Sequence, residues 1–145
     1  MSAAIDEGEL GLAALAVLRH AYAPYSRFRV GAALRSSDGM VSVGCNLENA
    51  AFPAGLCAER GALAAAVAGG HRTFERLVVA TEADEPSPPC GVCRQALIEF
   101  APGLQVVSIT TGGRRAAWTL SELLPLPFTS ASLANSMTDA RGGTN

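Results

Sequence analysis

The amino-acid sequence predicts a layered α/β fold, and three observations support that prediction. From residue 57 to 110, helix-forming segments alternate with short apolar runs, which is the rhythm of packed sheet and helix layers. Before them, Ser36-Ser37-Asp38-Gly39 separates two other apolar runs and indicates a hairpin. The length of 145 residues is enough for one domain with a single core.

The first element is a helix predicted over residues 7–21. Leucine and valine supply its apolar positions, and Ala23-Pro24 ends it, so we interpret it as a packing element. Two antiparallel strands follow at residues 29–35 and 40–46, joined by the hairpin turn.

Two further helices alternate with the remaining strands. The alanine-rich run 58–68 consists of good helix formers, and the run 90–100 begins after Pro88-Pro89. Strands are predicted at residues 76–82, 104–110 and 116–120, with a brief helix from Ser121. The domain is expected to span residues 1–128, and the polar composition of 129–145 predicts a partly disordered tail.

Composition excludes some classes of function. The net charge is −2 and the pI is near 5.6, and the eleven basic residues, all arginine, form no basic run. Polynucleotide binding is therefore disfavoured. The apolar run 10–18 is too short to cross a bilayer and lacks a basic flank, so we expect a cytoplasmic protein without membrane contact.

Three of the four cysteines lie in two short runs, Cys57-Ala58-Glu59 and Pro89-Cys90-Gly91-Val92-Cys93, whereas Cys45 stands apart. A catalytic zinc usually takes three protein ligands and keeps an open position, while a structural zinc takes four. Each run opens a predicted helix, and the partial positive charge of helix N-termini offsets the charge of the thiolates. The sequence therefore predicts a catalytic zinc site at Cys57, Cys90 and Cys93.

Glu59 lies two residues from a predicted ligand, on the same helical turn. A carboxylate in that place can take a proton from a water on the metal and pass it to a substrate, so Glu59 is the predicted catalytic residue. Arg60 and Arg94 adjoin the two ligand-bearing runs, and Arg60 is the better candidate to donate a hydrogen bond to a thiolate. The alternative interpretation is that Glu59, Arg60 and Arg94 are solvated residues on the surfaces of their helices.

These motifs together resemble the small cytidine deaminases among the zinc-dependent nucleoside deaminases. The resemblance covers roughly residues 10–128. It rests on Tyr25-Ser26-Arg27-Phe28-Arg29-Val30-Gly31-Ala32-Ala33, Asn46-Leu47-Glu48-Asn49-Ala50, Cys57-Ala58-Glu59-Arg60, Pro89-Cys90-Gly91-Val92-Cys93-Arg94-Gln95, and Leu123-Leu124-Pro125 before Phe128.

The resemblance implies a three-layer cytidine deaminase-like fold, with a mixed five-stranded sheet and helices on both faces. It also implies one zinc ion per subunit and a homotetramer whose active sites are shared between subunits. The implied reaction is the hydrolytic deamination of cytidine and 2′-deoxycytidine to uridine and 2′-deoxyuridine, with release of ammonia, in pyrimidine salvage.

The resemblance places substrate contacts at five residues. Asn46 and Glu48 would hold the ribose hydroxyls, and their alternation along a strand end points both to one side. Phe28 would pack against the nucleoside, the backbone at Ala58 would read the exocyclic amine, and a neighbouring subunit would contribute Phe128. The chain departs from the family pattern at Phe52, where a tyrosine is common, and at Gly61, where a threonine is common.

Two other functions remain open from the residues. The chain would be a deaminase of another aminopyrimidine nucleoside, such as blasticidin S, if the ribose-binding segment served another purpose. It would be a non-catalytic, zinc-stabilised binding protein if Cys45 supplied a fourth ligand. A nucleic-acid-editing deaminase is disfavoured by the acidic balance of charge.

Overall fold

The computed structural model describes residues 3–134. Its elements, in order along the chain, are α1 (Ala3–Leu18), β1 (Val30–Ser36), β2 (Val41–Cys45), the short 3₁₀ helix η1 (Phe52–Ala54), α2 (Ala58–Ala68), β3 (Phe74–Thr81), α3 (Gly91–Ile98), β4 (Gln105–Thr110), β5 (Arg115–Thr119) and α4 (Leu120–Leu123). The predicted order of helices and strands is confirmed. Residues 135–145 of the predicted tail lie outside the described part of the chain.

The first helix ends three residues earlier than predicted. It stops at Leu18, and the chain then turns so that Tyr22 donates its amide to the carbonyl of Asn46 at 2.9 Å. Tyr22 also accepts from the amide of Glu48 at 2.8 Å. Pairing with the segment after β2 therefore replaces the last predicted helical turn.

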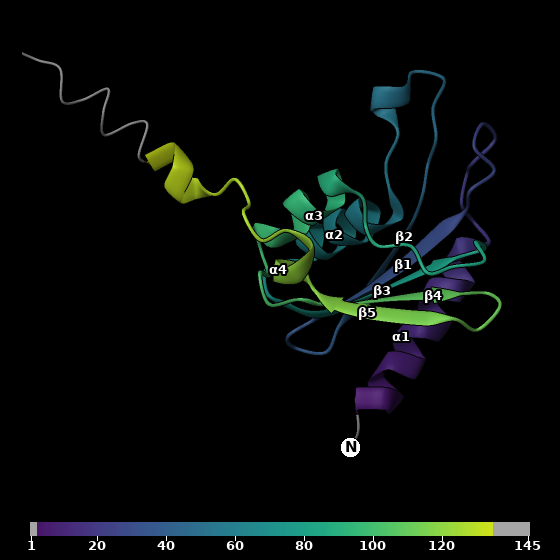
Figure 1. The fold of residues 1–145 in the computed structure, drawn as a ribbon, viewed down its shortest axis with the longest axis horizontal. Helices are drawn as coiled ribbons and strands as arrows, with labels where there is room; N and C mark the ends of the chain where they lie inside the picture. Colours follow the sequence, from purple (N-terminus) through teal and green to yellow (C-terminus); the bar gives the residue numbers. More distant parts are fainter. Residues whose placement is uncertain (1–2, 135–145) are drawn as a thin grey trace, which may run out of the picture.

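The five strands form one mixed sheet in the order β2-β1-β3-β4-β5. The β3–β4 pair is parallel and the other three pairs are antiparallel. The parallel pair is joined through α3, as parallel neighbours require a crossover connection. Figure 1 shows α1 on one side of the sheet and α2 with α3 on the other.

Each face of the sheet packs against its own helices. Leu34, Leu77 and Val106 join α2, α3 and α4 in the larger buried cluster. Ala33 and Val78, one residue along from Leu34 and Leu77, join α1 in the smaller cluster. This alternation follows from the period of two along a strand and confirms the predicted three layers.

Two glycines let the helices approach the sheet closely. A Cβ atom added at Gly31 in β1 would overlap the Ala14 carbonyl of α1. A Cβ atom at Gly44 in β2 would overlap the Ala58 carbonyl and the Ala62 amide of α2. Backbone therefore lies directly on backbone at both places, and Gly44 fixes how deeply the N-terminal part of α2 sits.

No helix in the described range 3–134 is both long enough and apolar enough to cross a bilayer. After α4 the chain leaves the body of the domain (Figure 1), and residues 130–134 are helical. Leu126, Phe128 and Leu133 are exposed along this segment.

Candidate active site

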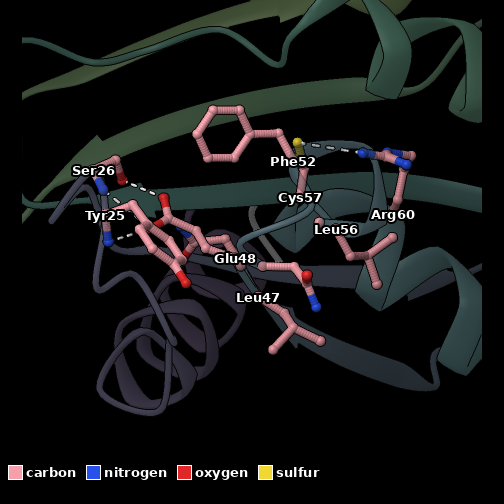
Figure 2. Close-up of a pocket in the computed structure, with 11 residues that line it drawn as sticks. Tyr25, Ser26, Leu47, Glu48, Phe52, Leu56, Cys57 and Arg60 are labelled. Atoms are coloured by element: carbon pink, nitrogen blue, oxygen red, sulfur yellow. Dashed lines mark hydrogen bonds between the residues drawn. The ribbon is translucent and has the colours of Figure 1, made fainter.

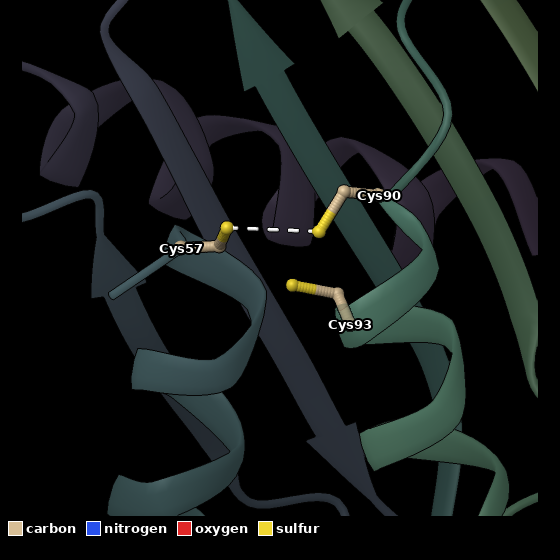
Figure 3. Close-up of side chains that lie close together, drawn as sticks. All are labelled: Cys57, Cys90 and Cys93. Atoms are coloured by element: carbon tan, nitrogen blue, oxygen red, sulfur yellow. Dashed lines mark hydrogen bonds between the residues drawn. The ribbon is translucent and has the colours of Figure 1, made fainter. Parts of the chain in front are cut away.

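Three thiols meet between the N-termini of α2 and α3. Cys57 is the N-cap residue of α2, Cys90 is the N-cap residue of α3, and Cys93 lies on the first turn of α3. Their Sγ atoms all lie within 4.8 Å of one another, and the Cys57–Cys90 pair is separated by 3.7 Å (Figure 3). The two runs that are 33 residues apart in sequence therefore converge on one point.

The thiol cluster has the geometry of a zinc site. Ligands about 2.3 Å from a tetrahedral zinc ion lie about 3.8 Å from each other, which agrees with the observed separation of Cys57 and Cys90. Among residues 3–134, the metal-ligating groups that come together here are these three cysteines, and Cys45 is not one of them. The three cysteines predicted as ligands thus lie together in a cluster that could hold one metal ion, and a set of three donors leaves a fourth tetrahedral position for a water.

The surroundings of the cluster favour the thiolate of Cys57. The pKa of Cys57 is lowered to about 5, first by the hydrogen bond from Cys93 and then by Arg60 and Cys90. The pKa of Cys93 is raised, because this thiol is the donor to Cys57 and is itself buried. Thiols must lose their protons to become metal ligands, so the binding of a metal here would release protons.

Glu59 is buried beside the thiols on the first turn of α2. Its side chain is 6% exposed, and Oε2 lies 3.8 Å from the Sγ atom of Cys93. Burial is the main cause that raises the pKa of this carboxyl, and the negative charge of Cys57 raises it further. A raised pKa makes a carboxylate a stronger base, which suits it to accept a proton and then pass it on.

The two arginines have different partners. Arg60 lies within hydrogen-bonding distance of Cys57, with 3.7 Å between Nη2 and Sγ. Arg94 instead donates to the carbonyl of Pro89 at 2.7 Å and to that of Leu123 at 2.8 Å. Arg94 therefore ties α4 to the loop before the Cys90 ligand, a role that its position in the sequence did not indicate.

A cavity of about 270 Å³ extends from the thiols toward the end of β2. Cys57, Cys90 and Glu59 line one end of the cavity. Ala58, which is fully buried, lines the cavity beside them. Its other lining residues include Phe28, Asn46 and Glu48, together with Ser26, Val30, Val79, Thr81, Ser87 and Pro88. The cavity thus joins the metal end to a polar end that is rich in hydrogen-bonding groups.

The polar end is held together by side chain to backbone hydrogen bonds. Asn46 accepts from the amide of Val30 at 2.9 Å and donates to the carbonyl of Phe28 at 2.7 Å. Glu48 accepts from the amides of Tyr25 and Ser26 at 2.9 and 3.1 Å, and from the hydroxyl of Ser26. The pKa of Glu48 is lowered, chiefly by the Ser26 hydroxyl, so its carboxylate stays ionised.

Comparison with known proteins agrees with this geometry. Residues 6–109 match the family described as the cytidine and deoxycytidylate deaminase zinc-binding region. The chain belongs to this family. It is 44% identical to a cytidine deaminase of Sporosarcina psychrophila over 115 residues, which is 79% of this chain and 85% of that one.

A solved structure and a more distant relative complete the comparison. The crystal structure of cytidine deaminase from Burkholderia pseudomallei matches with a TM-score of 0.81 and 44% identity, over 88% of this chain and 100% of that one. A blasticidin-S deaminase of Bacillus cereus is 30% identical over 112 residues, covering 72% of this chain and 79% of that one. The first match establishes the cytidine deaminase fold for this chain.

A second, larger cavity of about 550 Å³ adjoins the first, with Ser26, Asn46, Glu48 and Cys57 lining both. Figure 2 shows Phe52 and Tyr25 at this cavity, with Arg60 reaching the sulfur of Cys57. The two rings meet edge to face, with centroids 6.3 Å apart. Phe52 is 78% exposed, so this departure from the family pattern lies at an open surface.

Phe128 is the predicted substrate contact that this chain does not bring to either cavity. It lies on the segment after α4, is 60% exposed, and accepts a hydrogen bond through its carbonyl from Gln95 at 2.7 Å. Within the described residues it lines neither of the two cavities beside Cys57.

Sequence reasoning missed several polar residues of the pocket, Ser26 and Thr81 among them. Ser26 lines both cavities, and Thr81, buried at the end of β3, lines the smaller one. Ser26 lies within the family-like motif at residues 25–33. A single serine in a loop gives no sign that it bonds Glu48, 22 residues later. Thr81 is the last residue of the buried strand β3. The change from apolar residues to a threonine at this strand end is the sequence signal that could identify it.

Proposed function

We propose that this protein is a zinc-dependent hydrolytic deaminase that converts cytidine and 2′-deoxycytidine to uridine and 2′-deoxyuridine and releases ammonia. One observation carries the proposal: a single cavity has Glu59 and two metal-ligating thiols at one end, and Asn46 with Glu48 at the other. The similar proteins from Sporosarcina psychrophila and Burkholderia pseudomallei are cytidine deaminases, which supports the same substrate class.

The chemistry is assigned to the buried end of the cavity. When bound by Cys57, Cys90 and Cys93, a zinc ion supplies a Lewis acid that lowers the pKa of a water molecule in the cavity. Glu59 takes a proton from the water that adds to C4 of the cytosine ring, and it delivers that proton to N3. Glu59 then carries the proton of the new C4 hydroxyl to the amine, the C4–N bond breaks, ammonia leaves and the C4 carbonyl of the uracil ring forms.

The other residues orient the nucleoside and the ligands. Asn46 and Glu48 bind the sugar hydroxyls, and Phe28 packs against the nucleoside. The backbone at Ala58 reads the exocyclic amine. Arg60 donates to Cys57 and stabilises its thiolate, which favours metal binding over protonation.

The assembly and setting belong to the same proposal. A homotetramer with shared active sites would cover Leu126 and Phe128, which are 92% and 60% exposed here, and would let Phe128 close a neighbouring pocket. The domain is assigned to residues 1–128 and the tail to 129–145. All four cysteines are free, which favours a reducing, cytoplasmic compartment and a role in pyrimidine salvage.

Two alternatives rest on specific observations. The Bacillus cereus relative favours a deaminase for blasticidin S, although Asn46 and Glu48 line a cavity suited to a sugar. A non-catalytic zinc protein would need a fourth ligand, and Cys45 is the remaining cysteine.

The test is the ultraviolet absorbance of cytidine, 2′-deoxycytidine, cytosine and blasticidin S, each incubated with the purified protein with and without a zinc chelator. We expect both nucleosides to be converted, cytosine and blasticidin S to be spared, and the activity to stop on chelation. Conversion of blasticidin S alone would establish the first alternative. A folded, zinc-loaded sample that converts none, with all four thiols protected from a thiol reagent, would establish the second.

A further inference from the structure

Ser26 connects the groups at the polar end of the pocket, which is the sugar end in the proposed function. Its hydroxyl donates to the Glu48 carboxylate and accepts from the amide of Phe28 at 3.0 Å. Phe28 and Glu48 both line the smaller cavity. One oxygen atom therefore links the aromatic wall of the pocket to its carboxylate.

The loop around Ser26 has an uncommon backbone conformation. Arg27 has a φ of +58°, in the left-handed region, and it is the one non-glycine residue among residues 3–134 with a positive φ. Side chains other than Asn and Asp adopt this region at an energetic cost, so surrounding contacts must hold it. The three hydrogen bonds to Glu48 lie immediately before Arg27, and the one from Phe28 lies immediately after it.

The hydrogen-bonding capacity of Glu48 limits what it can do for a ligand. A carboxylate offers about four lone-pair sites, and the amides of Tyr25 and Ser26 with the Ser26 hydroxyl use three of them. About one site remains for a hydroxyl of the substrate. The bonds that Ser26 and Tyr25 make to Glu48, drawn in Figure 2, fix the direction of that site.

We propose that Ser26 is a positioning residue for nucleoside binding, because its hydroxyl holds Phe28 and Glu48 in place before the substrate enters. This inference rests on the proposed function and extends it to a residue outside the metal site. Ser26 acts through its two neighbours and takes no part in proton transfer. Its removal should therefore weaken binding more than it slows the chemical step.

The test is steady-state kinetics of Ser26→Ala with cytidine, beside Ser26→Thr and Ser37→Ala. Ser26 is exposed, so the alanine variant is expected to fold, with a modestly lower melting temperature because the loop at Arg27 loses two hydrogen bonds. We expect its KM to rise roughly tenfold, the order of a lost hydrogen bond to a charged group, with kcat within about twofold. Ser26→Thr keeps a hydroxyl and should restore most of the affinity. Ser37→Ala makes the same chemical change in the exposed β1–β2 turn and should leave both constants unchanged.

A second readout requires no turnover. The amide of Phe28 loses its acceptor in Ser26→Ala, so its hydrogen exchange, followed by nitrogen-15 NMR, should accelerate severalfold over wild type. An unchanged KM for cytidine, or equal exchange at Phe28 in the two proteins, would overturn the positioning role. If exchange at Phe28 differs between the two proteins but the wild type converts no nucleoside, the proposed function is overturned. The positioning role of Ser26 in the loop then still stands.

Discussion

The two ends of the pocket are built from different kinds of backbone. At the metal end, the functional groups stand on the first turns of α2 and α3, and Cys93 and Glu59 are buried against the core. At the sugar end they stand on the end of β2 and on a loop, and Phe28 is 41% exposed. The groups at the metal end are thus placed by packing, whereas those at the sugar end are placed by hydrogen bonds to the backbone. We expect changes at the metal end to act on kcat and changes at the sugar end to act on KM.

The largest effect should come from removing a ligand at the metal end. Cys93→Ser replaces a buried thiolate by a poor zinc ligand, so zinc content should fall to near zero and turnover to background. Cys45→Ser is the matched control, because Cys45 lies outside the thiol cluster, and it should keep one zinc per chain. Metal analysis of both purified variants gives the answer. Loss of zinc from Cys45→Ser would instead favour the four-ligand alternative.

Glu59→Gln should retain zinc and lose the proton transfer. The amide has nearly the shape of the carboxyl but cannot act as a base, so kcat should fall by roughly a thousandfold. Glu99→Gln, at the exposed C-terminal end of α3, is the control for the same chemical change and should keep full activity. Measured zinc content near one per chain in Glu59→Gln, together with a kcat close to wild type, would remove Glu59 from its proposed role.

Gly44→Ala tests how closely α2 must pack against β2, because it changes that packing without changing any predicted site residue. An added Cβ would meet the Ala58 carbonyl and the Ala62 amide, so α2 must move away from β2 and carry Cys57 and Glu59 with it. We expect about 1–3 kcal/mol lower stability and a loss of kcat/KM of up to roughly a hundredfold.

Two matched glycine variants sharpen that result. Gly31→Ala pushes on α1, on the opposite face of the sheet, so it should lower stability without changing zinc affinity. At Gly61 in α2 a Cβ would make only ordinary contacts, the nearest 3.6 Å from the Cα atom of Gly44, and alanine should add up to about 1 kcal/mol of stability. Thermal unfolding and chelator competition measure both effects. Equal zinc affinity in Gly44→Ala and Gly31→Ala would show that the depth of α2 does not matter to the metal end.

The smallest effect is expected at the sugar end. Glu48→Gln replaces the charged acceptor of the Tyr25 and Ser26 amides, so KM for cytidine should rise roughly tenfold while zinc content stays unchanged. Steady-state kinetics with cytidine checks this, again beside Glu99→Gln. A fall in kcat as large as that of Glu59→Gln would erase the proposed division between the two ends.

The same contrast explains what the sequence could predict. Cys57, Cys90 and Cys93 lie in contiguous runs at helix starts, which the proline-containing loops before them and the helix-forming residues after them indicate, so the metal end follows from spacing. The hydrogen bond from Ser26 to Glu48 joins residues that are 22 positions apart in sequence. The left-handed backbone at Arg27 lies directly beside this bond. Local propensity carries no signal for such a pairing.

The predicted order of elements succeeded for a similar reason, and its errors have a physical cause. Apolar runs of strand length and alanine-rich runs of helix length identify β3 and α2 without tertiary information. The end of α1 was misplaced because Tyr22 pairs with Asn46 across the fold. The close approach at Gly44 was also invisible, because a glycine in a strand does not reveal which backbone lies against it.

The most direct test of the account is a titration of zinc into the metal-free protein while the deamination rate of cytidine is recorded. The three-thiol site predicts that the rate rises in proportion to added zinc and levels off at one ion per chain, with one of the four thiols still reactive. Deamination at full rate before zinc is added, or none at one bound zinc per chain, would contradict the claim that this metal centre carries the reaction.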